Sequence, residues 1–213
     1  MESALRRASG TPGLKLIETM LWDGGRVPRW PLHLARLCDG AAALGWQAPV
    51  AVAEAALRAL PPSAPARLRL TLDAAGEAVI ETAPLPPVRP AWRLGLAEAP
   101  FWSGDPWLRI KSTRRETYDR ARASLPAGLD ELLFLNERDE VCEGSITTLF
   151  FDRGQGLRTP PLTSGLLPGV LRAELAVPEE VLLARDLPRV QLWVGNALRG
   201  LIPASWVGAD PVP

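Results

Sequence analysis

Residues 130–152 read DELLFLNERDEVCEGSITTLFFD, and this stretch holds three short apolar runs separated by polar turns. The runs are Glu131–Asn136, Val141–Cys142 and Thr147–Asp152. Short apolar runs bounded by turn residues are typical of strands, so we predict three strands joined by tight turns. Glu143, followed at once by Gly144, therefore lies between two strands and not in an exposed turn. The stretch predicts a sheet that carries a carboxylate.

A lysine precedes this sheet in the chain. Lys111 ends a short apolar segment, and residues 113–125 have the pattern of a helix. Thr113 and Glu116 fit a capping box, in which each side chain binds a backbone N–H at the start of a helix. We therefore expect Lys111 to stand immediately before a capped helix.

The choice of basic residue singles out the same lysine. Of the 24 basic residues, only Lys15 and Lys111 are lysines and the rest are arginines. Arginine stays protonated and cannot form an imine, whereas surroundings can deprotonate a lysine amine. A lysine kept in such a composition is a candidate for chemistry that arginine cannot perform.

The rest of the chain alternates strands and helices. Before residue 84 we expect strands at Leu14–Trp22, Arg67–Asp73 and Glu77–Thr82, and helices at Pro31–Gly45 and Val50–Leu60. Beyond residue 91 we expect further strands at Trp92–Ala97, Val181–Ala184 and Gln191–Val194, and a helix at Val170–Ala176. Strands and helices that follow one another in this way predict an α+β fold.

A proline-rich stretch divides these elements. Residues 84–90, PLPPVRP, hold four prolines in seven positions, which is typical of a stiff linker. We therefore predict a small N-terminal α/β domain (residues 1–85) and a linker (86–91). A larger C-terminal domain (92–213) follows and carries Lys111.

Composition excludes several classes of protein and site. The net charge is zero with a pI near 6.6, which does not indicate nucleic-acid binding. The sequence has no apolar run long enough to span a bilayer, and MESALRRASGTPG lacks the apolar stretch of a secretory signal. Cys38 and Cys142 are expected to be reduced thiols in a cytoplasmic protein. With His33 as the sole histidine, we expect no metal site and a structural role for that residue.

Four segments together resemble the class IV aminotransferases, the fold type IV enzymes of pyridoxal phosphate. They are residues 16–37 (LIETMLWDGGRVPRWPLHLARL), 111–122 (KSTRRETYDRAR), 130–151 with 159–172 (TPPLTSGLLPGVLR), and 194–204 (VGNALRGLIPA). The resemblance implies the two-domain fold of D-amino-acid and branched-chain aminotransferases, with a barrel-like mixed sheet in the larger domain. It also implies a homodimer acting on a small amino substrate, and typical members carry an extra hairpin ahead of the strand at Leu14.

The resemblance assigns roles around the cofactor. Lys111 would be the catalytic lysine that forms the Schiff base and moves the proton, and Glu143 would pair with the pyridine nitrogen. Arg36, the backbone of Val170 and Leu171, and Asn196 would bind the phosphate. Tyr118 would reach the cofactor hydroxyl.

Substrate recognition is inferred in the same way. Arg115, Arg199 and Thr147 are the residues we expect to contact the substrate. The sequence is closest to the 4-amino-4-deoxychorismate lyases, which form 4-aminobenzoate and pyruvate for folate synthesis. Two alternatives stay open: an aminotransferase for branched-chain or D-amino acids, and a cofactor-binding homologue without catalysis. The chain departs from the family pattern at Thr148, where Asn is usual, and at Ala197, where Ser is usual.

Overall fold

A three-stranded antiparallel sheet forms the centre of the N-terminal part of the chain. The sheet consists of β1 (Lys15–Trp22), β2 (Ala66–Asp73) and β3 (Ala78–Ala83), in that order. Every second residue of β2 is buried, namely Leu68, Leu70 and Leu72. This period of two is the pattern of a strand with one covered face. The three strands confirm those predicted from the sequence.

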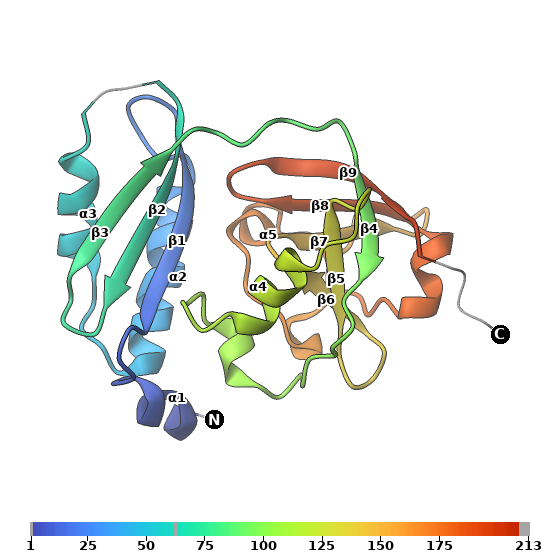
Figure 1. Ribbon diagram of the computed structural model, residues 1–213, viewed down its shortest axis with the longest axis horizontal. Coiled ribbons are helices and arrows are strands. Elements are labelled where there is room, and N and C mark those ends of the chain that lie inside the picture. Colours follow the sequence, from blue (N-terminus) through green and yellow to red (C-terminus); the bar gives the residue numbers. More distant parts are fainter. Residues whose placement is uncertain (1, 62–63, 209–213) are drawn as a thin grey trace. The chain divides into compact units, whose positions relative to one another are not determined.

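Helices cover that face of the sheet, as Figure 1 shows. They are α2 (Trp30–Leu44) and α3 (Val50–Arg58), within two residues of the predicted bounds. Gly45 ends α2 in a left-handed conformation (φ 73°), which glycine adopts without strain. A short helix, α1 (Glu2–Ala8), precedes the sheet and was not predicted, because its seven residues have no apolar period that marks a helix.

The computed structural model describes residues 2–61 and 64–208. The chain divides into two compact units. The first unit contains the chain up to Pro87 together with Arg109–Arg114, and the second contains Val88–Leu108 and the chain from Arg115 onward. Cys38 and Cys142 are both free thiols. Within the described ranges, no helix has the length and apolar character needed to cross a membrane.

The segment Arg109–Arg114 belongs to the first unit because it pairs with β1. Ile17 N donates a hydrogen bond to the Lys111 carbonyl (2.8 Å), and Thr113 N donates to the Lys15 carbonyl (2.8 Å). Leu16 and Ser112 form an antiparallel bridge. The expectation that Lys111 lies in the C-terminal domain therefore differs from the observed division, because backbone pairing ties this segment to β1.

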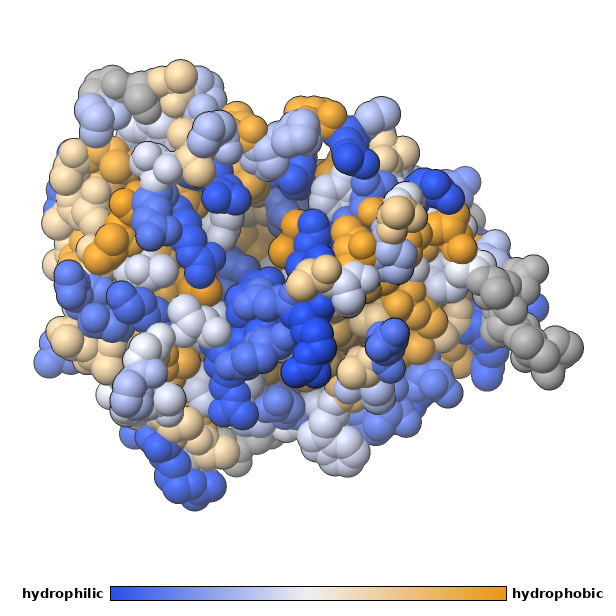
Figure 2. Space-filling model, viewed as in Figure 1, coloured by the Kyte–Doolittle hydropathy of each residue, from blue (hydrophilic) through white to orange (hydrophobic). Residues whose placement is uncertain are grey.

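The predicted capping box is also wrong, because Thr113 pairs with β1 and does not cap a helix. Helix α4 spans Glu116–Ala123, and its N-cap residue Arg115 makes no side-chain capping bond. The Thr113 hydroxyl instead accepts a hydrogen bond from Lys15 N (3.0 Å) and donates one to the Gly13 carbonyl (3.1 Å). The threonine thus serves the edge of β1 and not the start of α4. Figure 2 shows hydrophilic residues over α4, in line with its exposed charged side chains.

A six-stranded mixed sheet forms the second unit, in the order β6-β5-β4-β9-β8-β7. Its strands are β4 (Trp92–Leu96), β5 (Glu131–Leu135), β6 (Val141–Gly144), β7 (Thr148–Asp152), β8 (Gln191–Asn196) and β9 (Gly200–Trp206). Strand β4 runs parallel to both neighbours, and the other pairs are antiparallel. The outer strands β6 and β7 meet where Gly144 N donates to the Thr147 carbonyl (2.8 Å), so the sheet is a nearly closed barrel. The predicted α+β, fold type IV class is confirmed.

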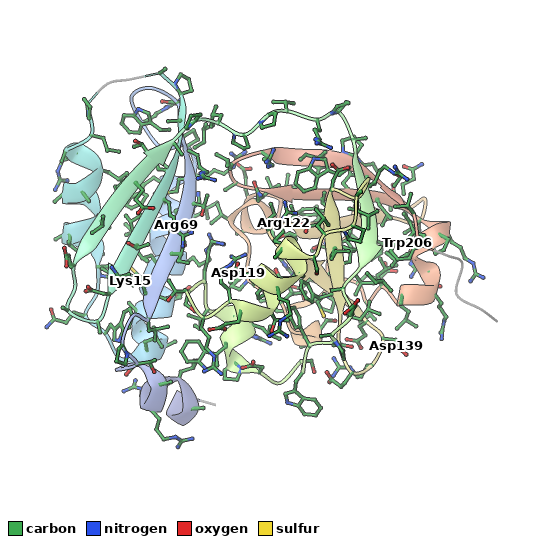
Figure 3. All side chains as sticks on the ribbon, viewed as in Figure 1. Lys15, Arg69, Asp119, Arg122, Asp139 and Trp206 are labelled. Atoms are coloured by element: carbon green, nitrogen blue, oxygen red, sulfur yellow. The ribbon has the colours of Figure 1, made fainter. Side chains whose placement is uncertain are left out.

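Helix α5 (Val170–Leu175) and three 3₁₀ helices complete the second unit's connections. The 3₁₀ helices are Pro106–Arg109, Leu162–Ser164 and Ala184–Arg189. The predicted strand Val181–Ala184 is wrong, because only Leu183 forms a bridge, to Glu140, before the chain turns into the third 3₁₀ helix. Strand β9, whose last residue Trp206 is labelled in Figure 3, was not predicted. Pro203 interrupts its run, and proline argues against a strand interior.

Candidate active site

Glu143 lies in β6 with 5 % of its surface exposed. Its Oε1 accepts hydrogen bonds from Tyr118 Oη (2.6 Å) and Leu167 N (3.1 Å). Burial and the nearby Glu143 carboxylate raise the pKa of Tyr118 well above its usual range. The phenol therefore stays protonated and donates its hydrogen to the carboxylate. In this structure Tyr118 donates its hydrogen bond to Glu143, and the contact with the cofactor hydroxyl that the family resemblance implies stays a prediction.

A second buried carboxylate, Glu131, fixes the connection Ser145–Thr147 between β6 and β7. Glu131 is fully buried and accepts from Ser145 Oγ (2.5 Å), Thr147 Oγ1 (2.9 Å) and Ile146 N (3.2 Å). Arg122, labelled on α4 in Figure 3, places Nη1 3.5 Å from Glu131 Oε1. Thr147, predicted to contact substrate, uses its hydroxyl in this cluster. The cluster holds the connection that begins at Ser145, two residues after Glu143.

Glycine is required at position 144, immediately before this connection. A Cβ at Gly144 would collide with Thr147 Oγ1 and with the Glu131 side chain (2.8 Å). We expect Gly144→Ala to lower the free energy of unfolding by roughly 1–3 kcal/mol, because overpacking forces buried neighbours to move. Urea unfolding would measure this effect. Gly25→Ala is the control, because a Cβ at Gly25 meets nothing within 4 Å, whereas Gly154 has a positive φ that would strain an alanine. An unchanged midpoint for Gly144→Ala would contradict the packing argument.

Two residues predicted to bind ligands hold the same connection from other sides. Arg115 Nη2 donates to the Ser145 carbonyl (3.2 Å), and its guanidinium lies 5.5 Å from the centre of the Tyr118 ring. Asn196 Nδ2 donates to the Ile146 carbonyl (3.1 Å). Asn196 Oδ1 also accepts from Leu198 N and Arg199 N (3.1 and 3.0 Å), which shapes the turn between β8 and β9. The side chains of both residues are therefore engaged within the protein.

The first residues of α5 pack against the sheet at two positions, Gly169 and Gly195, that leave no room for a side chain. A Cβ at Gly169, the N-cap residue, would lie 2.5 Å from Thr148 Oγ1. A Cβ at Gly195 would lie 2.5 Å from Leu171 Cδ2 and 2.6 Å from the Gly200 carbonyl. The side chains of Val170 and Leu171 are buried. The first N–H groups of a helix have no acceptor inside it, so these two residues offer donors at a fixed place.

Arg199, a predicted substrate residue, lies over the Trp92 ring at 5.2 Å from its centre. Burial lowers the pKa of Arg199, and the positive charges of Arg122 and Arg89 lower it further. Its guanidinium therefore belongs to a basic group of side chains on the second unit. Arg115 lies elsewhere, against the connection between β6 and β7.

In the first unit, Arg36 is part of a buried ionic cluster. Arg36 donates from Nε and Nη2 to the Glu18 carboxylate (2.9 and 2.6 Å), and His33 Nδ1 lies 2.6 Å from Glu18 Oε2. The side chains of Glu18 and His33 are each 1 % exposed. One edge of the Arg36 guanidinium is thus occupied by Glu18, so an anion would have to use another edge. The expectation of a structural role for His33 agrees with this position.

Lys111, also in the first unit, is half-buried and lies in the segment that pairs with β1. Its carbonyl accepts from Ile17 N, which fixes the backbone from which the amine projects. Lys15, the other lysine, lies in β1 and also pairs with this segment through its backbone.

Comparisons with known proteins give the family. The model of "Amino-transferase class IV" matches residues 15–207, which is most of the chain. The chain belongs to the class IV aminotransferase family. A Schizosaccharomyces pombe protein named "Putative aminodeoxychorismate lyase" is 30 % identical over 168 residues, or 75 % of this chain and 72 % of that protein.

Two solved structures illustrate the range of this class IV fold. A Mesorhizobium loti protein described as a "Putative amino-acid aminotransferase" is 42 % identical with a TM-score of 0.83, covering 91 % of this chain and all of that one. The 4-amino-4-deoxychorismate lyase of Pseudomonas aeruginosa is 23 % identical with a TM-score of 0.78, covering 93 % and 85 %. The latter likeness shows the fold alone. The family match and these relatives make the chain an enzyme of the pyridoxal-phosphate-dependent type.

Sequence reasoning missed two residues of this class IV enzyme, Glu18 and Glu131. Glu18 lies on the same face of β1 as Leu16, Met20 and Trp22, so its burial could be inferred from the period of two. Glu131 is the first residue of a continuous apolar run, ELLFL, whose first four residues are all buried. A carboxylate on the apolar face of a strand needs hydrogen-bond donors, and this was the signal available for both.

Proposed function

We propose that this enzyme binds pyridoxal phosphate through Lys111 and converts 4-amino-4-deoxychorismate to 4-aminobenzoate and pyruvate. The observation that carries the cofactor part is the buried Glu143 carboxylate, which Tyr118 and Leu167 hold in β6 of a class IV fold. The lyase reaction is supported by the S. pombe relative, which carries that name and matches three quarters of this chain.

The side chains present suit the cofactor's functional groups. Lys111 supplies an amine for the aldehyde, and Glu143 supplies an acceptor for a protonated pyridine nitrogen. The first turn of α5 offers backbone N–H groups, and Arg36 offers a guanidinium, for the phosphate. Asn196 and Tyr118 contribute indirectly. Asn196 positions the β6–β7 connection, and Tyr118 positions Glu143.

In the proposed reaction the protein's residues move one proton and orient the substrate. The cofactor, when bound, draws electrons from the carbon that bears the substrate's amino group. The Lys111 amine takes the proton from that ring carbon. The ether bond to the enolpyruvyl group then breaks and the ring becomes aromatic. The enolpyruvyl group leaves with its ether oxygen as enolpyruvate, which takes up the proton removed from the ring and tautomerises to pyruvate. Atoms and electrons therefore balance without an oxidant. Arg199 supplies positive charge for a substrate carboxylate.

A direct assay tests this proposal. Purified protein loaded with pyridoxal phosphate would be mixed with freshly generated 4-amino-4-deoxychorismate. We expect equal amounts of 4-aminobenzoate, measured by fluorescence after chromatography, and pyruvate, measured with lactate dehydrogenase. Absence of both products, with cofactor shown by mass spectrometry to be fixed on Lys111 after borohydride reduction, would overturn the lyase assignment.

A second candidate is an aminotransferase for D-amino or branched-chain amino acids. The M. loti relative, 42 % identical and named as an amino-acid aminotransferase, favours it. A single assay distinguishes the two functions, because only an aminotransferase forms glutamate from 2-oxoglutarate in the presence of D-alanine or L-leucine. Glutamate formation at a rate above that of 4-aminobenzoate formation would favour this candidate. Failure of borohydride to attach cofactor to Lys111 would instead indicate a homologue without catalysis.

A further inference from the structure

The sheet of the first unit has two faces that carry different side chains. Leu16 projects toward α2, because its Cδ2 lies 3.1 Å from the place that a Cβ on Gly40 would occupy. Successive residues of a strand point to opposite faces, so the odd-numbered residues of β1, beginning with Lys15, project from the other face. We call this other face the second face of the sheet.

Arg69 projects from the second face in β2, the central strand of the sheet (Figure 3). It pairs with Thr19 of β1 and with Glu81 of β3. Directly paired residues of antiparallel strands lie on the same face, so the register fixes the direction of the Arg69 side chain. Arg69 is half-buried, and within residues 2–61 and 64–208 it forms no ion pair. It therefore carries a charge that no carboxylate of the described chain contacts.

Lys111 projects from the same face. Leu16 and Ser112 form an antiparallel bridge, so their side chains share the face that α2 covers. Lys111 is next to Ser112 in the chain and points the opposite way. The bond from Ile17 N to the Lys111 carbonyl (2.8 Å) places Lys111 opposite Ile17, which belongs to the second face.

The register also gives the separation between the two cations. From Lys111 the ladder crosses Ile17 to Thr71 of β2, and Arg69 lies two residues from Thr71 along that strand. Two strand spacings across and two residue rises along separate the Cα atoms of Lys111 and Arg69 by about 12 Å. Two long side chains that project from these positions leave room between their ends for one six-membered ring.

The charges of the second face favour an anion. Among the described residues, four cations and two carboxylates project from this face of the three strands and from position 111: Lys15, Arg67, Arg69 and Lys111 against Asp73 and Glu81. The Asp73 carboxylate is also engaged in the β2–β3 turn, where it accepts hydrogen bonds from Ala75 N (3.0 Å) and Glu77 N (2.9 Å). A positive excess on one face attracts an anionic ligand.

The proposed substrate matches both the charge and the separation. 4-Amino-4-deoxychorismate carries its amino group and one carboxylate on opposite carbons of a six-membered ring, and 4-aminobenzoate keeps both groups. With the amino group at Lys111, the ring carboxylate points away from the lysine. The planar fork of an arginine binds both oxygens of such a carboxylate. An α-amino acid has one carbon between its amine and its carboxylate, so it would not span the distance from Lys111 to Arg69.

We propose that Arg69 binds the ring carboxylate of the substrate and thereby selects an amine whose carboxylate lies across a ring. This inference rests on the proposed function, which supplies the substrate and places its amine at Lys111. The substrate has a second carboxylate on its enolpyruvyl group, so the role of Arg69 is separate from that of Arg199.

The test is the substitution Arg69→Met, which keeps an unbranched apolar stem and removes the guanidinium. Calorimetry would give dissociation constants of the cofactor-loaded protein for 4-aminobenzoate and for 4-methylaniline, in which a methyl group replaces the carboxylate. We expect affinity for 4-aminobenzoate to fall about tenfold to a hundredfold, as for the loss of hydrogen bonds between charged groups. Affinity for 4-methylaniline should stay unchanged. The KM for 4-amino-4-deoxychorismate should rise by a similar factor.

A matched control lies on the same strand and the same face. Arg67 is two residues further from Lys111, with its Cα about 17 Å away, so it is too distant to bind the same carboxylate. Arg67→Met should keep both dissociation constants and the wild-type KM. Arg69→Lys keeps the charge but loses the fork, and its affinity for 4-aminobenzoate should lie between those of the wild type and Arg69→Met. The melting temperatures of the cofactor-free Arg67→Met and Arg69→Met proteins should be alike.

The outcomes distinguish this inference from the function on which it rests. If the wild type releases 4-aminobenzoate and pyruvate while Arg69→Met keeps the wild-type preference for 4-aminobenzoate over 4-methylaniline, the inference is wrong and the proposed function stands. Equal losses of affinity for the two ligands, or the same loss in Arg67→Met, would indicate a structural or general charge effect and would also overturn the inference. A wild type that releases neither product would overturn the proposed function and the inference together.

Discussion

Exchange of Lys111 for arginine is expected to abolish both covalent cofactor attachment and turnover. The guanidinium keeps the positive charge but stays protonated, so it can neither form an imine nor accept the substrate's proton. Since loss of a positioned proton-transfer group alone costs about 10²–10⁴-fold, we expect 4-aminobenzoate formation to fall by at least about 10³-fold. The backbone bond from Ile17 N to the carbonyl at position 111 does not depend on the side chain, so the fold should persist.

The chain provides a matched control for this variant. Lys15, its only other lysine, lies in β1, and its backbone pairs with the Lys111-bearing segment. Lys15→Arg should retain wild-type turnover and cofactor absorbance. Borohydride reduction followed by peptide mass spectrometry would show cofactor on the peptide containing Lys111 in Lys15→Arg and none in Lys111→Arg. Cofactor reduced onto Lys15 would contradict the assignment.

Removal of the Glu18 carboxylate is expected to produce the largest loss of stability. Glu18→Ala leaves the Arg36 charge and the His33 imidazole buried without their acceptor. Breaking a buried ion pair by removing one partner costs about 3–5 kcal/mol, and this should appear in urea unfolding. Glu54→Ala is the control in the same unit, because Glu54 pairs with Arg58 at the surface, where an ion pair is worth about 0–1 kcal/mol. Equal losses in the two variants would contradict this account.

The same carboxylate gives a pH dependence with a definite sign. Burial raises the pKa of Glu18, but the Arg36 charge and the hydrogen bonds from His33 and Arg36 outweigh it and lower the pKa to about 2. A carboxylate whose pKa is lower in the folded state stabilises the protein fully above its ordinary pKa of 4.5. That contribution is lost as the pH falls from 4.5 towards 2. The difference in unfolding free energy between wild type and Glu18→Gln should therefore shrink over this interval, and a constant difference would argue against an ionised Glu18.

The sequence predicted local features well where one chemical signal dominated. Alternation of polar and apolar residues predicted β2. The motif around Glu143 predicted a carboxylate immediately after a strand, and the structure extends that strand, β6, to include Glu143. The sequence did not predict which backbone groups Thr113 would meet, because a capping box and a strand pairing use the same hydroxyl. The partner that decides between them, Lys15, is 98 residues away.

Side-chain partners within the site were harder to predict than the identities of the residues. The family resemblance assigned the Tyr118 hydroxyl to the cofactor but did not indicate its hydrogen bond to Glu143, 25 residues away. Asn196 and Arg115 both contact the β6–β7 connection through its carbonyl groups. Backbone acceptors carry no mark in the sequence, so a long-range bond to a carbonyl cannot be inferred from residue types.

The pairing of Arg109–Arg114 with β1 also bears on how the protein is made. A ribosome has to synthesise more than a hundred residues before this segment can reach the edge of β1. Until then, that edge exposes unpaired backbone N–H and C=O groups, which in other proteins recruit strands from neighbouring chains. A nascent or truncated chain ending at Pro87 would keep this edge open. The residues that position Lys111 therefore also complete the first unit. Folding of this unit and placement of the proposed catalytic amine are then the same late event in biosynthesis.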